Sequence, residues 1–167
     1  MTDERLPLVT IMGPTGVGKT DLAISLTKLV SSEIISVDSV QVYKGMDIGS
    51  GKASKDILNK YPHKLVSFID PWKSYSTALF ILDATREINL CDRSNKVPLL
   101  VGGTMLYFRS LLSGISRMPE ANQEVRNEIS DRAKKYGWGL LHKELSKVDP
   151  ESAQRIHPND SQRIQRA

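Results

Sequence analysis

One short segment, Gly13 to Thr20, restricts the fold more than any other part of this sequence. It reads Gly-Pro-Thr-Gly-Val-Gly-Lys-Thr and matches the pattern G-x-x-x-x-G-K-[ST] at every fixed position. An apolar run, Leu6 to Met12, precedes it, and apolar side chains at helical spacing follow from Asp21 to Val30. Strand, glycine-rich turn and helix in this order predict backbone N–H groups and a helix N-terminus that face an anion. We therefore expect the chain to bind a phosphate group.

The residue types of this loop suit that task. Its glycines allow the backbone to wrap with the N–H groups pointing inward, Lys19 brings a compact positive charge to the terminal phosphate oxygens, and Thr20 offers a hydroxyl to Mg²⁺. Thr20 is thus the predicted metal ligand and Mg²⁺ the predicted cofactor. The predicted phosphate-binding residues are Gly13, Pro14, Thr15, Gly16, Val17, Gly18, Lys19 and Thr20.

Strand and helix patterns continue to alternate through the first two thirds of the chain. Strand candidates are Glu33–Asp38, Lys64–Ile69 and Val97–Val101, and the helix candidates between and after them are Thr77–Asn89 and Met105–Leu112. Val97–Val101 is almost wholly apolar, which is typical of a buried parallel strand. The pattern predicts an α/β fold with a parallel sheet flanked by helices, similar to that of P-loop NTPases.

The composition changes after Gly114, where strand candidates end. Glu120–Tyr136 has the pattern of a charged amphipathic helix, Gly137–Gly139 interrupts it, and Leu140–Val148 is again helical. Asp149-Pro150 is typical of a helix start. We expect an α/β core over residues 1–116 and the beginning of a helical insertion domain over residues 117–167. The sequence stops inside a predicted helix, so we expect a chain truncated at its C-terminus.

Composition narrows the class of protein less sharply. The 167 residues include 40% hydrophobic and 25% charged ones, and no stretch approaches the roughly 20 apolar residues of a membrane-spanning helix. The N-terminus lacks the apolar segment of a secretory signal, and the single cysteine, Cys91, fits a reducing compartment. The net charge of +4 and the pI near 9.2 are compatible with nucleic-acid binding without requiring it. We expect a cytoplasmic monomer without a membrane partner.

The residues at two strand ends bear on which phosphate compound is bound. P-loop NTPases commonly hold their metal with an aspartate at the end of an apolar strand, but here Val97–Val101 runs into Gly102-Gly103-Thr104. Asp38 stands at the carboxyl end of the second predicted strand, at the edge where α/β sheets bind ligands. Three roles remain open for Asp38: general base, indirect metal ligand, or a cap of the next turn.

Several separate blocks of the sequence together resemble the bacterial tRNA dimethylallyltransferase family. They occur in the family's order and spacing and cover nearly the whole chain, which makes the resemblance far more specific than the phosphate loop alone. The blocks are Gly13–Thr20, Ile34–Gly49, Val101–Phe108, Asp149–Glu151 and Arg155–Ala167.

The resemblance implies a prenyl transfer. Family members move the dimethylallyl group of dimethylallyl diphosphate to N6 of an adenosine adjacent to the tRNA anticodon, which gives N6-isopentenyladenosine. Asp38 matches the family's general base, and Thr104 matches a position beside the flipped adenine. The phosphate loop would then hold the diphosphate of the donor, which explains a phosphate site without the usual metal aspartate.

The resemblance also implies a set of contacts with the tRNA anticodon stem-loop. Taken alone, Arg126 has the pattern of a solvated helix charge, and Thr104 that of a loop hydroxyl bonded to nearby backbone groups. The positions that match the family's tRNA contacts are Asp38, Ser39, Val40, Gln41, Thr104, Arg126, Gln162, Arg163, Ile164, Gln165 and Arg166.

This sequence departs from the family pattern in four places and in length. Gly16 stands where the family more often has alanine, His63 followed by lysine replaces a Pro-His-His motif, and Ser74 and Leu79 replace acids. We assign His63 no catalytic role. Family members are considerably longer, so we expect this chain to keep diphosphate binding in part and to be weak or inactive as a transferase.

Three other functions fit parts of the sequence. A small-molecule or nucleoside kinase would share the loop, the parallel sheet and Mg²⁺, with Asp38 as base for an attacking hydroxyl. Against this function, the present sequence lacks the metal aspartate and an arginine-rich lid. An adenine-nucleotide prenyltransferase would share the donor chemistry, although a mononucleotide needs no helical clasp. A non-catalytic tRNA-binding fragment would bind through phosphate contacts and would keep its affinity without Asp38.

Overall fold

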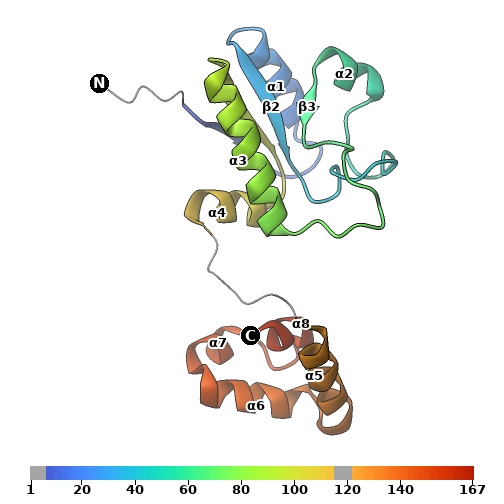
Figure 1. Ribbon diagram of the computed structural model, residues 1–167, viewed down its shortest axis with the longest axis vertical. Helices are drawn as coiled ribbons and strands as arrows, with labels where there is room; N and C mark the ends of the chain where they lie inside the picture. The colour runs from blue at the N-terminus through green and yellow to red at the C-terminus, as the bar shows by residue number, and fades with distance from the viewer. Residues whose placement is uncertain (1–6, 115–121) are drawn as a thin grey trace, which may run out of the picture. The chain divides into compact units, whose positions relative to one another are not determined.

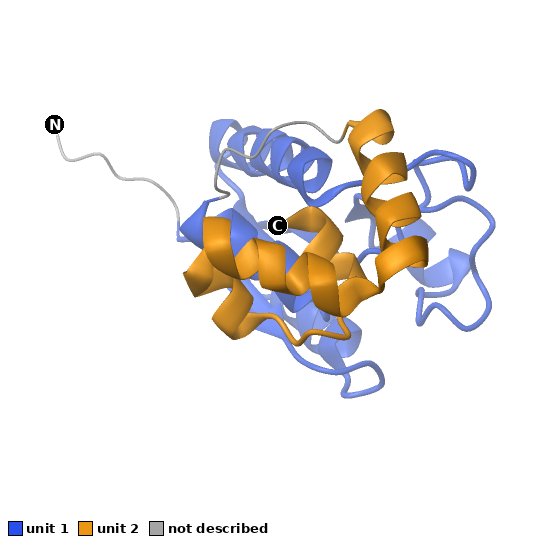
Figure 2. Ribbon diagram, turned by 90° about the horizontal axis from the view of Figure 1, so that it is seen from below, with its two compact units in different colours: residues 1–116 blue, residues 117–167 orange. Residues whose placement is uncertain are grey.

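The computed structural model describes residues 7–114 and 122–167 (Figure 1). The chain divides into two compact units, Met1–Ser116 and Arg117–Ala167, coloured separately in Figure 2. The boundary expected between residues 116 and 117 lies outside the described residues, as do Leu6 and Glu120, with which two predicted elements begin. Within the described part, no helix has the length and apolar character needed to cross a membrane.

Unit 1 is built on a parallel sheet of four strands in the order β1-β4-β2-β3. The strands are β1 (Val9–Met12), β4 (Val97–Gly102), β2 (Ser32–Val37) and β3 (His63–Lys64). Gly102 pairs with Met12 on one side and Val37 on the other, so three strands end at the same level. The predicted α/β fold with a parallel sheet is confirmed.

Helices cover both faces of this sheet because alternate residues of a strand point to opposite sides. Helix α1 (Lys19–Thr27) packs over Ile34, Leu99 and Val101. Helices α3 (Thr77–Arg93) and α4 (Met105–Ser113) pack over Ile35 and Leu100 on the other face, and Figure 1 shows α1 and α3 on opposite sides. Each fully buried aliphatic side chain contributes about 1.5–3 kcal/mol, so this double packing holds the central strands firmly.

The prediction of a strand over Lys64–Ile69 is wrong beyond Lys64. Leu65 and Ser67 have left-handed backbone conformations, with φ angles of 62° and 52°, and these turn the chain out of the sheet. The segment pairs instead with the loop that follows β2: the Phe68 amide donates to the Val42 carbonyl at 2.9 Å. A short helix, α2 (Lys55–Lys60), precedes it. Apolar alternation alone does not reveal such positive φ angles.

Unit 2 consists of four described helices: α5 (Gln123–Tyr136), α6 (Trp138–Val148), α7 (Pro150–Arg155) and α8 (Ser161–Arg166). Their apolar faces meet in a small core around Ala133, Leu141 and Ile164.

Capping side chains set where these helices start. Asp149 accepts from the Ser152 amide at 3.0 Å, which confirms the predicted helix start, and Asn122 caps α5 in the same way. The interruption predicted over Gly137–Gly139 is confined to Gly137, whose φ angle is 81°, because α6 already begins at Trp138.

Candidate active site

The phosphate loop connects the end of β1 to the start of α1 and is shaped by two left-handed glycines. Gly16 and Gly18 have φ angles of 84° and 85°, a conformation that residues with a Cβ rarely adopt. Helix α1 starts at Lys19, whose ammonium group curls back to the carbonyl oxygens of Gly13 and Pro14 at 2.8 and 2.6 Å. The loop therefore surrounds a small space into which amide groups and one positive charge can be directed.

The end of β4 lies so close to its neighbours that only glycine fits there. A Cβ on Gly102 would stand 2.0 Å from the carbonyl oxygen of Val37, and one on Gly103 would stand 3.2 Å from that of Gly13. An aspartate at Gly102, where P-loop NTPases place a metal ligand, would not fit without a shift of the backbone. The absence of a carboxylate at this strand end is thus part of the packing.

Asp38 and Thr104 lie 66 positions apart in the sequence but meet at the carboxyl edge of the sheet. Oδ1 of Asp38 accepts hydrogen bonds from the amides of Val40 (2.8 Å) and Gln41 (3.1 Å), so the carboxylate does cap the turn after β2. The Thr104 hydroxyl accepts from the Ser39 amide at 3.1 Å. Among the described residues Oδ2 of Asp38 accepts no hydrogen bond, which leaves this oxygen free to take a proton.

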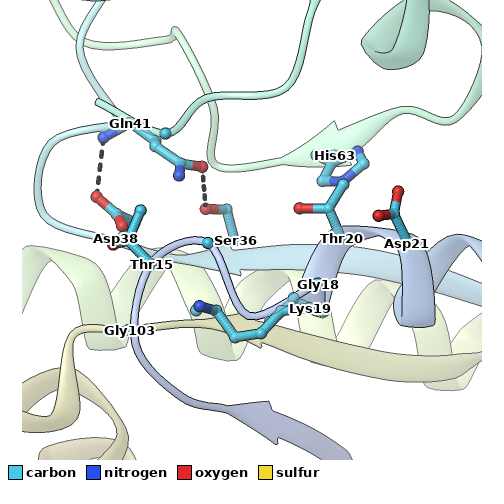
Figure 3. Close-up of a pocket in the computed structure, with 14 residues that line it drawn as sticks. Thr15, Gly18, Lys19, Thr20, Asp21, Ser36, Asp38, Gln41, His63 and Gly103 are labelled. Atoms are coloured by element: carbon cyan, nitrogen blue, oxygen red, sulfur yellow. Dashed lines mark hydrogen bonds between the residues drawn. The ribbon is translucent and has the colours of Figure 1, made fainter. Parts of the chain in front are cut away.

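A cavity of about 320 Å³ joins the phosphate loop to Asp38 (Figure 3). It therefore places the predicted anion site and the predicted base in one space, and the Asp38–Gln41 and Ser36–Gln41 contacts line its upper wall in the view. The lining residues are Thr15, Gly16, Gly18, Lys19, Thr20, Asp21, Ser36, Asp38, Gln41, Gly51, His63, Val101, Gly102 and Gly103.

The oxygen groups near the loop fit Mg²⁺ better than a metal that needs an all-protein cage. In the part of the chain that the structure describes, no cluster of three or more His, Cys, Asp or Glu side chains could hold a metal ion. Mg²⁺ keeps several water ligands and is commonly bound by one or two protein oxygens together with phosphate oxygens. The Thr20 hydroxyl, with the Asp21 carboxylate in the same cavity wall, meets that requirement.

His63 is a residue of this cavity that the sequence did not identify as functional. Its ring lies near Thr20 and Asp21 in Figure 3, and Nδ1 is 2.6 Å from the carbonyl oxygen of Tyr61. Burial lowers the pKa of His63, so the ring is neutral near pH 7, with Nδ1 donating to Tyr61. Nε2 is buried and has no hydrogen-bond partner among the residues that the structure describes. The sequence held one signal of a functional position for His63: it directly precedes the strand predicted over Lys64–Ile69.

Helical periodicity divides the predicted RNA-contacting residues of unit 2 into two groups. Ile164 is buried in the core, and Gln165 holds α8 against α5 by donating to the Arg126 carbonyl (3.1 Å) and the Ser130 hydroxyl (2.9 Å). The exposed group is Arg126, Gln162, Arg163 and Arg166. Gln165 holds α8 against α5 next to Arg126, so the exposed arginines of the two helices lie on neighbouring segments of unit 2.

Comparison with known proteins decides the family. The model of the IPP transferase family matches residues 41–167, and that of the isopentenyl transferase family matches residues 6–64. The chain belongs to the IPP transferase family. The two matches together include the phosphate loop and Asp38 in unit 1 and the whole described part of unit 2.

Solved structures similar to this IPP transferase chain come from bacteria and a eukaryote. A tRNA isopentenylpyrophosphate transferase from Bacillus halodurans is 41% identical, with a TM-score of 0.63 over 95% of this chain and 53% of that one. The corresponding Staphylococcus epidermidis protein is 37% identical, with a TM-score of 0.61 over 96% and 52% of the two chains. A eukaryotic dimethylallyltransferase acting on tRNA is 29% identical, with a TM-score of 0.80 over 95% and 40%. This chain thus spans about half the length of the bacterial proteins.

Proposed function

We propose that this chain carries the donor site and the general base of a tRNA dimethylallyltransferase, which converts an adenosine adjacent to the anticodon to N6-isopentenyladenosine. The observation that carries the proposal is the single cavity that contains both the phosphate loop and Asp38. Membership of the IPP transferase family, and the tRNA-related names of the similar structures, supports the choice of donor and acceptor.

The phosphate loop holds the diphosphate of dimethylallyl diphosphate. Amide groups of the loop and the ammonium group of Lys19 face the negative charge that grows on the diphosphate as it leaves. To do so, Lys19 exchanges its carbonyl partners at Gly13 and Pro14 for phosphate oxygens. The Thr20 hydroxyl would hold Mg²⁺, which when bound would neutralise part of the charge on the diphosphate.

Asp38 is the group that removes the proton from the adenine amine. An exocyclic amine of adenine is a poor nucleophile, so a positioned base and a stabilised leaving group both lower the barrier. N6 forms a bond to C1 of the dimethylallyl group, the bond between C1 and the diphosphate oxygen breaks with its electron pair leaving on oxygen, and the N6 proton passes to Oδ2 of Asp38. The amides bonded to Oδ1 fix the direction of this carboxylate.

The acceptor is an adenine that leaves its stack to enter the cavity, as enzymes that modify bases within folded nucleic acids require. Gln41 lines this cavity, and Ser39, Val40 and Thr104 lie next to Asp38 in the turn after β2 and at the start of α4, where they would contact the target base and its neighbours. The exposed residues of unit 2, Arg126, Gln162, Arg163 and Arg166, bind the backbone of the anticodon stem-loop. The chain acts as a monomer, which sedimentation of the complex checks.

Mass spectrometry of unmodified tRNA after incubation with the chain, dimethylallyl diphosphate and Mg²⁺ tests the reaction. The expected result is the gain of one dimethylallyl group on the adenosine next to the anticodon. An arm with AMP in place of tRNA tests the adenine-nucleotide acceptor, and modification of AMP alone would overturn the tRNA assignment. Calorimetric titration with dimethylallyl diphosphate tests the donor site without turnover.

A competition experiment separates the transferase from a kinase. Dimethylallyl diphosphate should displace a fluorescent diphosphate probe at lower concentration than ATP does. The glycine packing at the end of β4 supports this expectation, because no carboxylate stands there to hold the metal of a nucleoside triphosphate. Tighter binding of ATP, with phosphate transfer to a small hydroxyl compound, would contradict the proposed function.

A further inference from the structure

An exposed tryptophan stands on the turn between β3 and α3. The side chain of Trp72 is 81% exposed, whereas tryptophan in folded proteins is on average highly buried. It occupies a central position of a turn in which the Lys73 amide donates to the Asp70 carbonyl at 2.9 Å, with Pro71 as the other central residue. Proline suits the first central position of such a turn because its φ angle is already fixed. The turn thus presents the indole ring to solvent.

The turn is held rigidly on both sides. The carboxylate of Asp70 binds the ammonium groups of Lys44 (2.9 Å) and Lys73 (3.3 Å), which together lower the pKa of Asp70 and keep it charged. On the side that leads into α3, Phe68 and Tyr75 pack edge to face, with ring centroids 5.5 Å apart. These contacts hold the backbone of the turn, so ordering the turn costs little conformational entropy when a partner binds.

The turn lies beside the segment that follows Asp38. The Lys44 amide donates to the Ile69 carbonyl at 2.8 Å, and Tyr43 forms a parallel bridge with Ile69. Tyr43 and Lys44 come only a few residues after Asp38. The turn from Asp70 to Lys73 therefore lies at the same end of unit 1 as the carboxyl edge of the sheet (Figure 1).

The charges around Trp72 are predominantly positive. The side chains of Lys44 and Lys73 are 54% and 63% exposed, and Asp70 neutralises only one of the two. An exposed ring on a turn that carries Lys73 and binds Lys44 through Asp70 suits unpaired nucleotides, because a base can stack on the ring while phosphates contact the lysines. A protein partner would be expected to need a wider apolar patch than one ring.

We propose that Trp72 is a stacking platform for an unpaired base of the RNA substrate, with Lys44 and Lys73 binding the adjoining phosphates. The inference rests on the proposed function, because the RNA bound here is the one whose adenosine enters the cavity. The base on Trp72 is a different nucleotide from the target adenosine. Its stacking compensates part of the energy needed to open the loop of the RNA and so favours the extruded adenosine.

Tryptophan fluorescence tests this contact directly. The chain contains two tryptophans, so Trp138→Phe leaves Trp72 as the only indole reporter. Titration of this variant with an unmodified anticodon stem-loop RNA should quench the fluorescence as the complex forms. In the parent chain, Trp72→Ala should weaken binding of the same RNA by about 5- to 150-fold, the range expected for loss of one stacked base.

Four further variants separate stacking from other causes. Trp72→Phe should retain part of the affinity, whereas Trp72→Leu, which is apolar but not aromatic, should behave as the alanine variant does. Leu29→Ala removes another exposed apolar side chain, 80% exposed, from the end of α1 and should leave binding unchanged. Lys73→Ala should lower the slope of log K against log salt by about 0.7, the value for one phosphate contact to a single strand.

The outcomes distinguish this inference from the proposed function. Equal RNA affinity in the Trp72→Ala variant and the parent, without quenching of Trp72, would overturn the platform and leave the transferase standing. A parent chain that binds dimethylallyl diphosphate but no stem-loop RNA would overturn the platform together with the tRNA acceptor, and leave the donor site. Self-association that depends on Trp72 in sedimentation, without RNA quenching, would replace the RNA with a second copy of the chain.

Discussion

In the phosphate loop of unit 1 the groups that face the cavity are held by backbone geometry, whereas in unit 2 the residues proposed to bind RNA are exposed side chains on short helices. Gly16 and Gly18 adopt left-handed angles, and Gly102 has no room for a side chain. In unit 2, by contrast, Arg126 and Arg166 are exposed. The difference teaches that a rigid backbone suits a small, highly charged ligand such as a diphosphate, whereas exposed side chains suit a large and flexible ligand such as RNA.

The largest effect is expected at the base. Asp38→Asn should reduce turnover by about 10²- to 10⁴-fold, because the amide cannot accept the N6 proton. Its Oδ1 can still accept from Val40 and Gln41, so thermal stability and RNA affinity should stay near those of the parent. Single-turnover rates measured by mass spectrometry check this. A variant that keeps most of its turnover would show that Asp38 only caps its turn.

The next largest effect concerns the stability of the rigid backbone. Gly102→Ala should lower the free energy of unfolding by about 3 kcal/mol, because the new Cβ would lie 2.0 Å from the Val37 carbonyl and the strands must separate. Gly139→Ala in unit 2 is the matched control, since a Cβ there meets nothing within 4 Å. Urea unfolding of both variants is the measurement. Equal midpoints would remove the contrast between the two units.

A smaller effect is expected when the charge in the loop is removed. Lys19→Ala should weaken binding of dimethylallyl diphosphate by about 10- to 100-fold, which corresponds to one hydrogen bond between charged groups. Lys28→Ala, at the exposed residue directly after the end of α1, is the control with the same loss of charge. Calorimetry compares the two. Similar losses in both variants would indicate a general effect of charge rather than a contact with the phosphate.

The smallest effects are expected on the helical surface. Arg166→Ala should weaken stem-loop RNA binding by a few fold and lower the salt slope by about 0.9, as the loss of one phosphate contact predicts. Gln165→Ala should instead lower the stability of unit 2 by about 1–2 kcal/mol, because α8 loses two hydrogen bonds to α5. Filter binding at several salt concentrations and thermal unfolding separate the two. An unchanged slope for Arg166→Ala would exclude this arginine from the RNA contacts.

The sequence predicted the parts of unit 1 that rest on local patterns. The strand, turn and helix around Gly13–Thr20 are confirmed, and so are the central strands β2 and β4, because long apolar runs and glycine-rich turns have few alternative structures. The strand predicted over Lys64–Ile69 failed because its direction is set by contacts with the Gln41–Lys44 segment, and a pattern of alternating residues carries no information on such contacts.

The residues that line the cavity were found only in part. Asp38 was identified through the resemblance, whereas His63 was assigned no role although it lies in the cavity wall, and Thr104 is not among the lining residues. Likewise, the segment Gln162–Arg166 was predicted to contact tRNA as a whole. Helical geometry instead turns Ile164 into the core and Gln165 toward α5, so only part of the segment faces solvent. Neither the place of His63 in the cavity wall nor the burial of Ile164 can be recognised from the order of the residues alone.

By itself, the sequence determined the phosphate loop, because glycines, a lysine and a threonine at those spacings between a strand and a helix admit one arrangement of the backbone. It also determined that β4 ends without a carboxylate. Only the tertiary structure decided that Asp38 and the loop share one cavity and that Thr104 lies beside Ser39 at the same edge of the sheet. That proximity depends on the alignment of β1, β4 and β2, which comes from hydrogen bonding and packing between segments far apart in the chain.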